Sequence, residues 1–264
     1  MMEATEAKTL ATRYLEQLDA LDHHRPLAAE ASDSSLEAAY LVQAEFQSLL
    51  TGRGDQLVGY KVALTSKAMQ EFCGVDQPLS GAVYERVVVE SPTTVTLADH
   101  CHLGVEFEVA VVLRADLPAG SEPHTRDSIR ESIATCHPAF ELVEDRNADY
   151  GELNVFDLVS ENAWNAGVVL GAGVSAWHGV DLESARTRLQ TNGVDIGEGK
   201  TGDALGHPLE AVAWLANHLN DRGLMLKQGH LVMTGSSIVT QFPAVGDELH
   251  FTIDGLGEVR LSCI

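Results

Sequence analysis

The segment from Gly104 to Leu113 constrains the fold most, because it is an apolar stretch that carries two glutamates. It is rich in β-branched and aromatic residues and follows a loop, which is typical of a β-strand. Side chains alternate between the two faces of a strand, so Glu106 and Glu108 are predicted to share one face. The alternate residues, valines and a phenylalanine, would then face a hydrophobic core.

Two carboxylates in this arrangement lie about 6–7 Å apart at their Cα atoms. At that separation they repel each other unless a cation lies between them or one of them holds a proton. One interpretation is that Glu106 and Glu108 supply oxygen ligands to a hard divalent cation such as Mg²⁺ or Mn²⁺. The alternative is an edge strand with two solvated glutamates, which is the commoner situation for a bare Glu-x-Glu pair. A third ligand is needed to decide between the two.

The overall composition indicates a substantial core. The chain has 264 residues, 45% of them hydrophobic, which suits one large domain or one domain with a helical extension. No apolar run approaches the roughly 18 residues of a membrane span, and the acidic start lacks the features of a signal peptide. A formal net charge of −22 argues against nucleic acid or an anionic membrane as a partner. It also means that a site for an anion needs a local cation, either a metal or a lysine.

The cysteines carry information about the compartment. Cys73, Cys101, Cys136 and Cys263 are scattered along the chain without C-x-x-C spacing. This pattern fits neither a zinc site nor a disulfide framework. We therefore expect the protein in a reducing cytoplasm.

Helical and β-rich patterns divide the chain near residue 57. Apolar residues recur at helical spacing over residues 5–21 and 35–51, which predicts an N-terminal helical region over residues 1–56. Short strands and turns dominate residues 57–264, and the long β–α–β alternation of a doubly wound sheet is missing. We expect an α+β fold in which the helices and this β-rich catalytic core form one functional unit.

Within the β-rich part, apolar alternation and turn residues predict the individual elements. We expect strands over residues 57–64, 83–89, 93–97, 104–113, 139–144, 168–171, 186–189, 194–196, 230–233, 248–253 and 257–261. We expect a turn-rich loop over residues 74–81, a hairpin turn at Asn192-Gly193, and helices over residues 65–72, 125–137 and 208–221.

Two further charged residues stand in apolar strands. Lys61 shares its face with small residues, which leaves room for a ligand beside its amine. The alternative is a lysine that reaches solvent from the edge of a sheet. Glu141 lies between Phe140 and Leu142, where a carboxylate is costly unless it is paired or bound to a metal. Glu141 is the third candidate ligand, and the alternative is that it faces solvent on a two-sided strand.

Six short motifs follow one another in an order and spacing that resemble a known family. They are Gly59–Ser66, Gly74–Pro78, Glu106–Glu108, Ala139–Val143, Leu205–Pro208 and Met233–Ser236. Together they look like the 2-hydroxypenta-2,4-dienoate (2-oxopent-4-enoate) hydratase and 4-oxalocrotonate decarboxylase branch of the fumarylacetoacetate hydrolase superfamily. The resemblance covers residues 30–264.

The resemblance implies a mixed β-roll core preceded by a layer of helices. It implies a Mg²⁺ or Mn²⁺ site, because Glu106, Glu108 and Glu141 fall on the three carboxylate ligand positions of the family. Lys61 falls on its active-site lysine. It also implies a homo-oligomer, and a complex with a paralogous decarboxylase or hydratase is a further possibility.

The same resemblance implies additional site residues. Asp76 and Ser160 would act in catalysis, with Asp76 or a metal-bound water delivering the hydroxyl group. Asn162, Thr234 and Trp164 would contact the substrate. The branch commonly has Ala-Asp-Asn-Ala-Ser where this chain has Ser160 to Trp164, so a tryptophan replaces a small residue. Trp164 would narrow the pocket or stack on a conjugated substrate, and the alternative is a core tryptophan.

The implied activity is metal-dependent addition of water to a 2-hydroxy-2,4-dienoate (a 2-oxo-4-enoate). The product would be a 4-hydroxy-2-oxo acid, and the setting would be meta-cleavage catabolism of aromatic compounds. The alternatives are a 4-oxalocrotonate-type 2-oxo acid decarboxylase and a non-catalytic accessory subunit of a hydratase–decarboxylase complex. These residues do not separate the hydratase from the decarboxylase.

Overall fold

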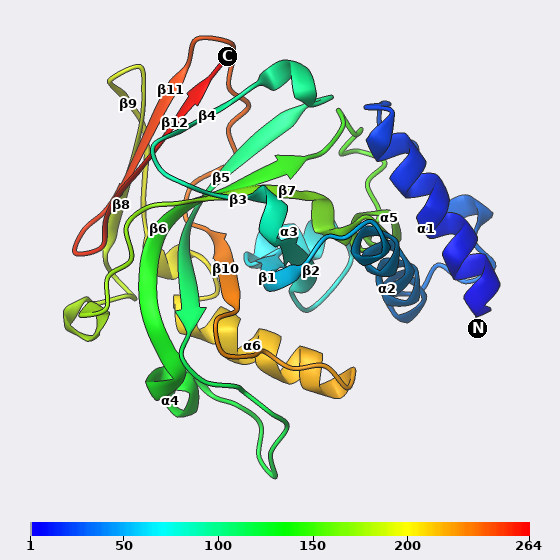
Figure 1. Ribbon diagram of the computed structural model, residues 1–264, viewed down its shortest axis with the longest axis horizontal. Helices are drawn as coiled ribbons and strands as arrows, with labels where there is room; N and C mark the ends of the chain where they lie inside the picture. The colour runs from blue at the N-terminus through cyan, green and yellow to red at the C-terminus, as the bar shows by residue number, and fades with distance from the viewer. Residues whose placement is uncertain (1) are drawn as a thin grey trace.

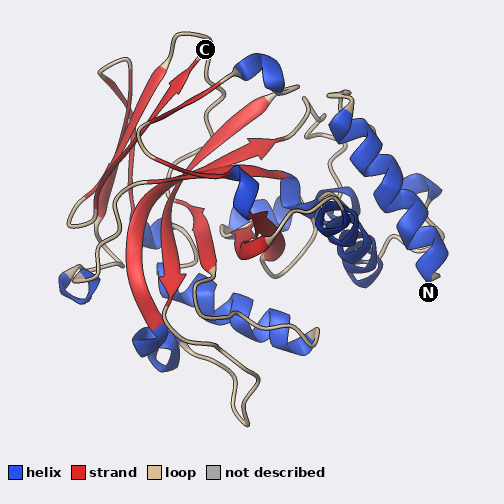
Figure 2. Cartoon of the chain, in the orientation of Figure 1, coloured by secondary structure: helices blue, strands red, loops and turns tan. Residues whose placement is uncertain are grey.

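The computed structural model describes residues 2–264, which form two β-sheets with helices to their right and below them in the view of Figures 1 and 2. The α-helices are α1 (Ala4–Asp19), α2 (Leu36–Gly52), α3 (Lys67–Phe72), α4 (Arg126–Ile129), α5 (Val155–Ser160) and α6 (Pro208–Asp221). The strands are β1 (Leu57–Ala63), β2 (Leu79–Tyr84), β3 (Val88–Glu90), β4 (Thr93–Val95), β5 (Leu103–Leu113), β6 (Ile133–Glu144), β7 (Asn165–Leu170), β8 (Arg186–Thr191), β9 (Val194–Lys200), β10 (Leu231–Ser236), β11 (Glu248–Ile253) and β12 (Gly257–Cys263).

The larger sheet has seven strands in the order β2-β1-β10-β5-β6-β7-β3, and the smaller has five in the order β4-β12-β11-β8-β9. Parallel pairs, such as β1 with β10 and β3 with β7, occur beside antiparallel pairs such as β5 with β6. The prediction of an α+β fold with mixed strands is therefore confirmed.

The two faces of β5 are in different environments, as the alternation of its side chains predicts. Phe107 is fully buried and packs on Phe140 of β6 and Phe251 of β11, with ring centroids 5.7 and 5.6 Å away. These contacts join the two sheets. Glu106 and Glu108 point to the opposite face of the larger sheet, which is the face that carries the candidate site.

Helices α1 and α2 form the N-terminal layer and lie side by side (Figure 1). Ser35 caps α2 by accepting a hydrogen bond from the backbone N–H of Ala38 at 3.3 Å. Buried residues of both helices, including Tyr14 and Phe46, belong to the same hydrophobic cluster as the strands. The division into residues 1–56 and 57–264 stays a prediction about folding units.

The expected helix over residues 125–137 is wrong in its second half. Helix α4 and the 3₁₀ turn Arg130–Ser132 end it, and Ile133 begins the long strand β6. Residues 133–137 pair with β5, from Leu113 opposite Ile133 to Ala110 opposite His137, with one irregularity between Val112 and Leu113. The apolar residues at helical spacing also suit a strand, and pairing along the whole edge of β5 overrides the local pattern.

The other predicted element boundaries differ less from those in the structure. The expected strand over residues 83–89 is two strands, β2 and β3, separated by the 3₁₀ turn Glu85–Val87. Strand β2 begins at Leu79, inside the segment expected to be a loop. The hairpin at Asn192-Gly193 is confirmed, with φ angles of +54° and +76° at the two residues. Within residues 2–264, no helix is long and apolar enough to cross a bilayer.

Candidate metal centre

Three glutamates meet on one face of the β5–β6 pair, the face opposite the one that packs on the smaller sheet. Glu106 lies directly opposite Glu141 in the antiparallel register, and Glu108 lies two residues further along β5. One carboxylate oxygen from each lies within 4.8 Å of the other two. Glu108 and Glu141 are fully buried, so the solvent-facing alternative for Glu141 is wrong. The structure therefore brings together the three carboxylates that the sequence singled out.

Each carboxylate is oriented by a neighbouring group. The Thr240 hydroxyl donates to Glu106 at 2.9 Å, the Gly235 backbone N–H donates to Glu108 at 2.8 Å, and the Asn165 amide donates to Glu141 at 2.9 Å. Glu108 Oε1 and Glu141 Oε2 are buried and have no hydrogen-bond partner among residues 2–264. Buried carboxylate oxygens without donors are costly in a protein and are suitable ligands for a hard divalent cation. The donor set therefore fits Mg²⁺ or Mn²⁺.

The backbone of β10 makes this arrangement possible. Its pairing with β5 shifts between Met233 and Ser236, and Gly235 adopts a φ of +102° at the irregularity. A Cβ atom on Gly235 would lie 2.4 Å from the side chain of Thr65, so only glycine fits there. The irregular backbone turns the Gly235 N–H toward Glu108.

Lys61 joins the same cluster from β1. It is 3% exposed, and its Nζ lies 3.1 Å from Glu141 Oε1, so the alternative of a lysine reaching solvent is wrong. Burial by itself would lower the pKa of Lys61. The negative charges of Glu141 and the other two glutamates outweigh that effect and hold the pKa above its ordinary value. Lys61 is therefore an ammonium group beside the carboxylates.

The carboxylates are destabilised in their charged form. Burial, followed by the charges of Glu141 and Glu106, raises the pKa of Glu108 well above its ordinary value. Burial also raises the pKa of Glu141, although Lys61 acts in the opposite direction. Three carboxylates thus share one ammonium group, and their charged forms lack compensating positive charge.

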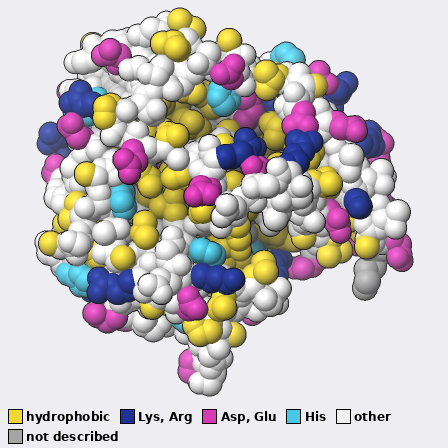
Figure 3. Space-filling model, in the orientation of Figure 1, with side chains coloured by type: hydrophobic (Ala, Val, Ile, Leu, Met, Phe, Trp, Pro, Cys, Tyr) yellow, Lys and Arg dark blue, Asp and Glu magenta, His cyan; other side chains and the backbone are white. Residues whose placement is uncertain are grey.

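A cavity of about 400 Å³ opens in front of the cluster, with Lys61 and Glu106 in its wall. This volume lies within the roughly 300–1,000 Å³ of small-molecule sites. Most of its remaining wall is apolar, and includes Val143, Leu153, Leu158, Trp164, Ile238 and Phe242. Figure 3 shows one face of the molecule, where hydrophobic side chains gather in a hollow with charged side chains around its rim.

Trp164 lines this cavity and also packs in the hydrophobic core, and its contact with a substrate stays a prediction. It belongs to a turn in which Asn162, Ala163 and Trp164 all have φ between +49° and +57°. This left-handed conformation is tolerated by asparagine but is unfavourable for alanine and tryptophan, so the surrounding contacts must hold the turn. Trp164 also lines a second cavity of about 290 Å³ on the side of helices α1 and α2.

Asn162 holds this turn against β2. Its amide exchanges two hydrogen bonds with the backbone of Ala82, at 2.7 and 2.9 Å, and it also accepts one from Gln47. Asn162 is not among the residues that line the 400 Å³ cavity. The structure thus places its side chain in a positioning contact with β2, and its expected contact with the substrate stays a prediction.

Three other predicted residues lie away from the cavity wall. The hydroxyl of Thr234 donates to the carbonyl of Val109 at 2.7 Å, inside the sheet. Ser160 is fully buried at the end of α5, and its hydroxyl has no partner among residues 2–264. Asp76 is exposed in the loop between α3 and β2. The structure does not bring these side chains to the carboxylates, and their catalytic or substrate-binding roles stay predictions.

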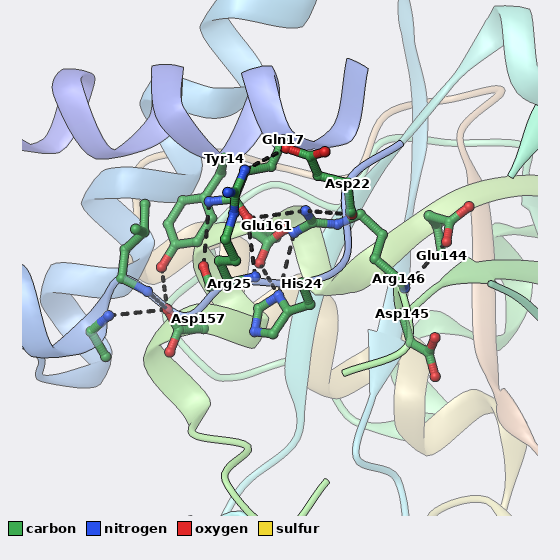
Figure 4. Close-up of polar contacts among 12 residues, drawn as sticks. Tyr14, Gln17, Asp22, His24, Arg25, Glu144, Asp145, Arg146, Asp157 and Glu161 are labelled. Carbon is green, nitrogen blue, oxygen red and sulfur yellow. Dashed lines mark hydrogen bonds and ion pairs between the residues drawn. The ribbon is translucent and has the colours of Figure 1, made fainter. Parts of the chain in front are cut away.

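A second buried polar cluster joins residues of α1, of α5 and of the segment after β6 (Figure 4). Arg146 is fully buried and forms an ion pair with Glu161, whose other oxygen lies 2.9 Å from Nδ1 of His24. Tyr14 of α1 donates a hydrogen bond to Asp157 of α5. The cluster therefore fastens the N-terminal layer to α5 and to the turn that carries Trp164.

Sequence reasoning missed Gly235, Thr240 and Asn165, which orient the carboxylates. A glycine inside a strand indicates an irregularity or a close backbone approach, so the irregularity at Gly235 could have been predicted from the sequence. Thr240 and Asn165 are separated from their partners by 134 and 24 residues, and no local pattern distinguishes them.

Comparison with known proteins agrees with this geometry. The family described as fumarylacetoacetate (FAA) hydrolase C-terminal matches residues 61–262. The 2-keto-4-pentenoate hydratase of Burkholderia vietnamiensis is 33% identical over 235 residues, which cover 89% of this chain and 88% of that protein. The 2-hydroxyhexa-2,4-dienoate hydratase of Comamonas testosteroni is 30% identical over 252 residues, which cover 95% and 94%.

Among solved structures, 4-oxalocrotonate decarboxylase from Pseudomonas putida G7, complexed with magnesium and adipate, superposes with a TM-score of 0.94. It is 26% identical in sequence, and the match covers 100% of this chain and 99% of that one. The family match extends over most of the chain, and it includes the strands that carry the three glutamates. The chain therefore belongs to the fumarylacetoacetate hydrolase family.

Proposed function

We propose that this chain is a metal-dependent hydratase that adds water to a 2-hydroxy-2,4-dienoate and forms a 4-hydroxy-2-oxo acid. The observation that carries the proposal is the cluster of Glu106, Glu108, Glu141 and Lys61 at the wall of a mostly apolar cavity. The hydratases among its relatives support the same activity. We further propose that the reaction belongs to meta-cleavage catabolism of aromatic compounds.

The three glutamates would hold the cation, and their remaining charge is offset by Lys61. When bound, a divalent cation supplies Lewis acidity to the carboxylate and the adjacent oxygen of a 2-oxo acid. Thr240, the Gly235 N–H and Asn165 keep the glutamates in place, because each donates to one carboxylate.

Lys61 is the group of this chain that would act on the substrate oxygen. Its ammonium faces the cavity and would stabilise negative charge that develops on the 2-oxygen as the dienol becomes the ketone. In that step the hydroxyl proton leaves oxygen and a proton is added at carbon 5. Water then adds across carbons 3 and 4, with its oxygen on carbon 4.

The proposal is tested by following the ultraviolet band of 2-hydroxypenta-2,4-dienoate with purified protein, in Mg²⁺ or in chelator. We expect metal-dependent loss of the band and a product heavier by one water. The protein with Glu141→Gln should lose this activity, because a charged carboxylate ligand is replaced by a neutral and weaker amide oxygen. Failure of the metal-loaded protein to consume the dienoate would contradict the proposal.

The second candidate is decarboxylation of 4-oxalocrotonate, which the structural match to a decarboxylase favours. Release of carbon dioxide from 4-oxalocrotonate, with the pentadienoate inert, would identify that activity. Inactivity toward both substrates with metal bound would favour an accessory subunit.

We also propose a homo-oligomer, with a paralogous decarboxylase or hydratase as a possible partner, in a reducing cytoplasm. All four cysteines are free in the described part of the chain, which supports a reducing compartment. Light scattering on the purified protein would measure the subunit number, and co-purification with the paralogue would test the complex.

A further inference from the structure

We propose that the cavity selects a substrate with a neutral, apolar tail and discriminates against one whose tail ends in a second carboxylate. The tail is the part of the molecule beyond the 2-oxo acid end. This inference rests on the proposed function, because it assumes that the 2-oxo acid end lies at the glutamates. The rest of the molecule must then occupy the remainder of the cavity.

The wall available to the tail is largely hydrocarbon. It includes Leu158 of α5, Ala163 and Trp164 of the turn after α5, and Ile238 and Phe242 of the segment after β10. An apolar tail that enters such a pocket removes apolar surface from water on both partners.

The charged groups in the wall do not suit a second anion. Among the described residues that line the cavity, Lys61 is the only lysine or arginine, and it is already 3.1 Å from Glu141. The other charged residues of the wall are Glu106 and Asp203, which would repel a carboxylate. A distal carboxylate would therefore lose hydration without gaining a partner of opposite charge.

The hydroxyl donors in the wall are mostly engaged elsewhere. Thr240 donates to Glu106, Tyr150 donates to Asp145 at 3.0 Å, and Ser236 donates to the carbonyl of Ile238 at 2.6 Å. They have no second proton to offer a carboxylate. The hydroxyls of Thr65 and Ser66 also line the cavity, but they are uncharged.

This preference separates the two candidate activities. 4-Oxalocrotonate carries a second carboxylate, whereas 2-hydroxypenta-2,4-dienoate ends in a vinyl group. A cavity of this composition therefore favours the hydratase substrate over the decarboxylase substrate.

The test compares two 2-oxo acids that differ only at the end of the tail, 2-oxohexanoate and 2-oxohexanedioate. Their affinities for the Mg²⁺-loaded protein are measured by calorimetry, so turnover is not required. We expect 2-oxohexanoate to bind more tightly by about tenfold or more, the size of effect typical of a pocket that leaves a charge unpaired. Equal or tighter binding of the dicarboxylate would overturn the inference, and so would failure of both acids to bind.

Met69 offers a matched pair of variants. It lines the cavity from α3 and is 38% exposed, so a polar side chain there does not disturb the core. Met69→Lys should raise the affinity for 2-oxohexanedioate relative to 2-oxohexanoate by about tenfold, whereas Met69→Gln should leave the ratio unchanged. A ratio that is the same in both variants would contradict the electrostatic cause.

The two proposals can fail separately. If the dienoate is not hydrated but the monocarboxylate binds preferentially, the proposed function fails and the tail preference stands. If the dienoate is hydrated but the dicarboxylate binds equally well, the function stands and the tail preference fails.

Discussion

At the scale of single residues, the cluster is short of positive charge. Glu108 and Glu141 each keep one buried oxygen without a hydrogen-bond partner in residues 2–264, although their other oxygens are held by protein donors. Lys61 supplies one positive charge against three glutamates. A divalent cation would remove the imbalance, and this is the physical reason for the arrangement.

Replacing Lys61 should separate catalysis from metal binding. Lys61→Met keeps most of the length of the side chain and removes its charge. We expect kcat to fall by about a hundredfold or more, because charge on the substrate oxygen is no longer stabilised, while a divalent cation still binds. The exposed Lys67, whose Nζ is 3.1 Å from Gln70, provides the control variant Lys67→Met, which should leave kcat unchanged. Full activity of Lys61→Met would rule out the role given to this lysine.

Trp164 should set the size of the substrate tail that the 400 Å³ cavity accepts. It lines both this cavity and the neighbouring 290 Å³ cavity, so it separates the two. Trp164→Phe leaves an aromatic ring but frees volume. We expect the ratio of kcat/KM for a dienoate with a bulky apolar tail to that for the pentadienoate to rise by roughly tenfold. Trp177, a fully buried tryptophan outside both cavity walls, provides the control Trp177→Phe, which should leave the ratio unaltered. An unchanged ratio in Trp164→Phe would show that the ring does not limit the tail.

At the scale of elements, β5 was predictable and β6 was only partly so. Its β-branched and aromatic residues, with Glu106 and Glu108 between apolar neighbours, identify a strand over residues 104–113 from sequence alone, and the structure has that strand over Leu103–Leu113. The first part of β6 is a strand because it pairs with β5. These partners are distant in sequence, so a pattern of a few consecutive residues does not reveal the pairing. The irregularity of β10 at Gly235 depends in the same way on two neighbouring strands.

The conformation at Gly235 gives a test of this irregularity. Gly235→Ala adds a Cβ that meets Thr65 at 2.4 Å and also strains a residue with φ of +102°. We expect the free energy of unfolding to fall by about 2 kcal/mol or more, together with weaker metal binding. Gly246 has φ of +94° and no atom within 4 Å of an added Cβ, so Gly246→Ala isolates the strain of the backbone. If the two variants lose the same stability and bind metal equally, the contact with Thr65 is unimportant.

The buried ion pair of Arg146 and Glu161, which lies between the N-terminal layer and α5, should contribute to stability. Arg146→Met leaves Glu161 buried without its guanidinium partner. The free energy of unfolding, measured in urea, should fall by about 3–5 kcal/mol. Arg86 forms an ion pair with Asp55 and has a side chain that is 60% exposed, so Arg86→Met should cost no more than about 1 kcal/mol. Similar losses in both variants would contradict the importance of burial.

At the scale of the whole molecule, the sequence predicted those site residues whose importance shows in a short local pattern. The three glutamates and Lys61 could be proposed because a charge in an apolar strand needs a partner. The hydrogen bonds of Asn162 and Thr234 could not be read in this way. Their side chains bind backbone groups of β2 and β5, and only the packed fold brings those groups within reach. The net charge of −22 likewise pointed to a local cation without locating it.

The most direct measurement is calorimetric titration of Mg²⁺ and Mn²⁺ into metal-stripped protein, beside the variant Glu108→Gln. Glutamine can still accept the hydrogen bond of Gly235 but brings no charge to the site. We predict one bound ion per chain and an affinity at least about tenfold weaker in the variant. Absence of binding to the unaltered protein, or equal binding by Glu108→Gln, would contradict the assignment of these glutamates as a metal site.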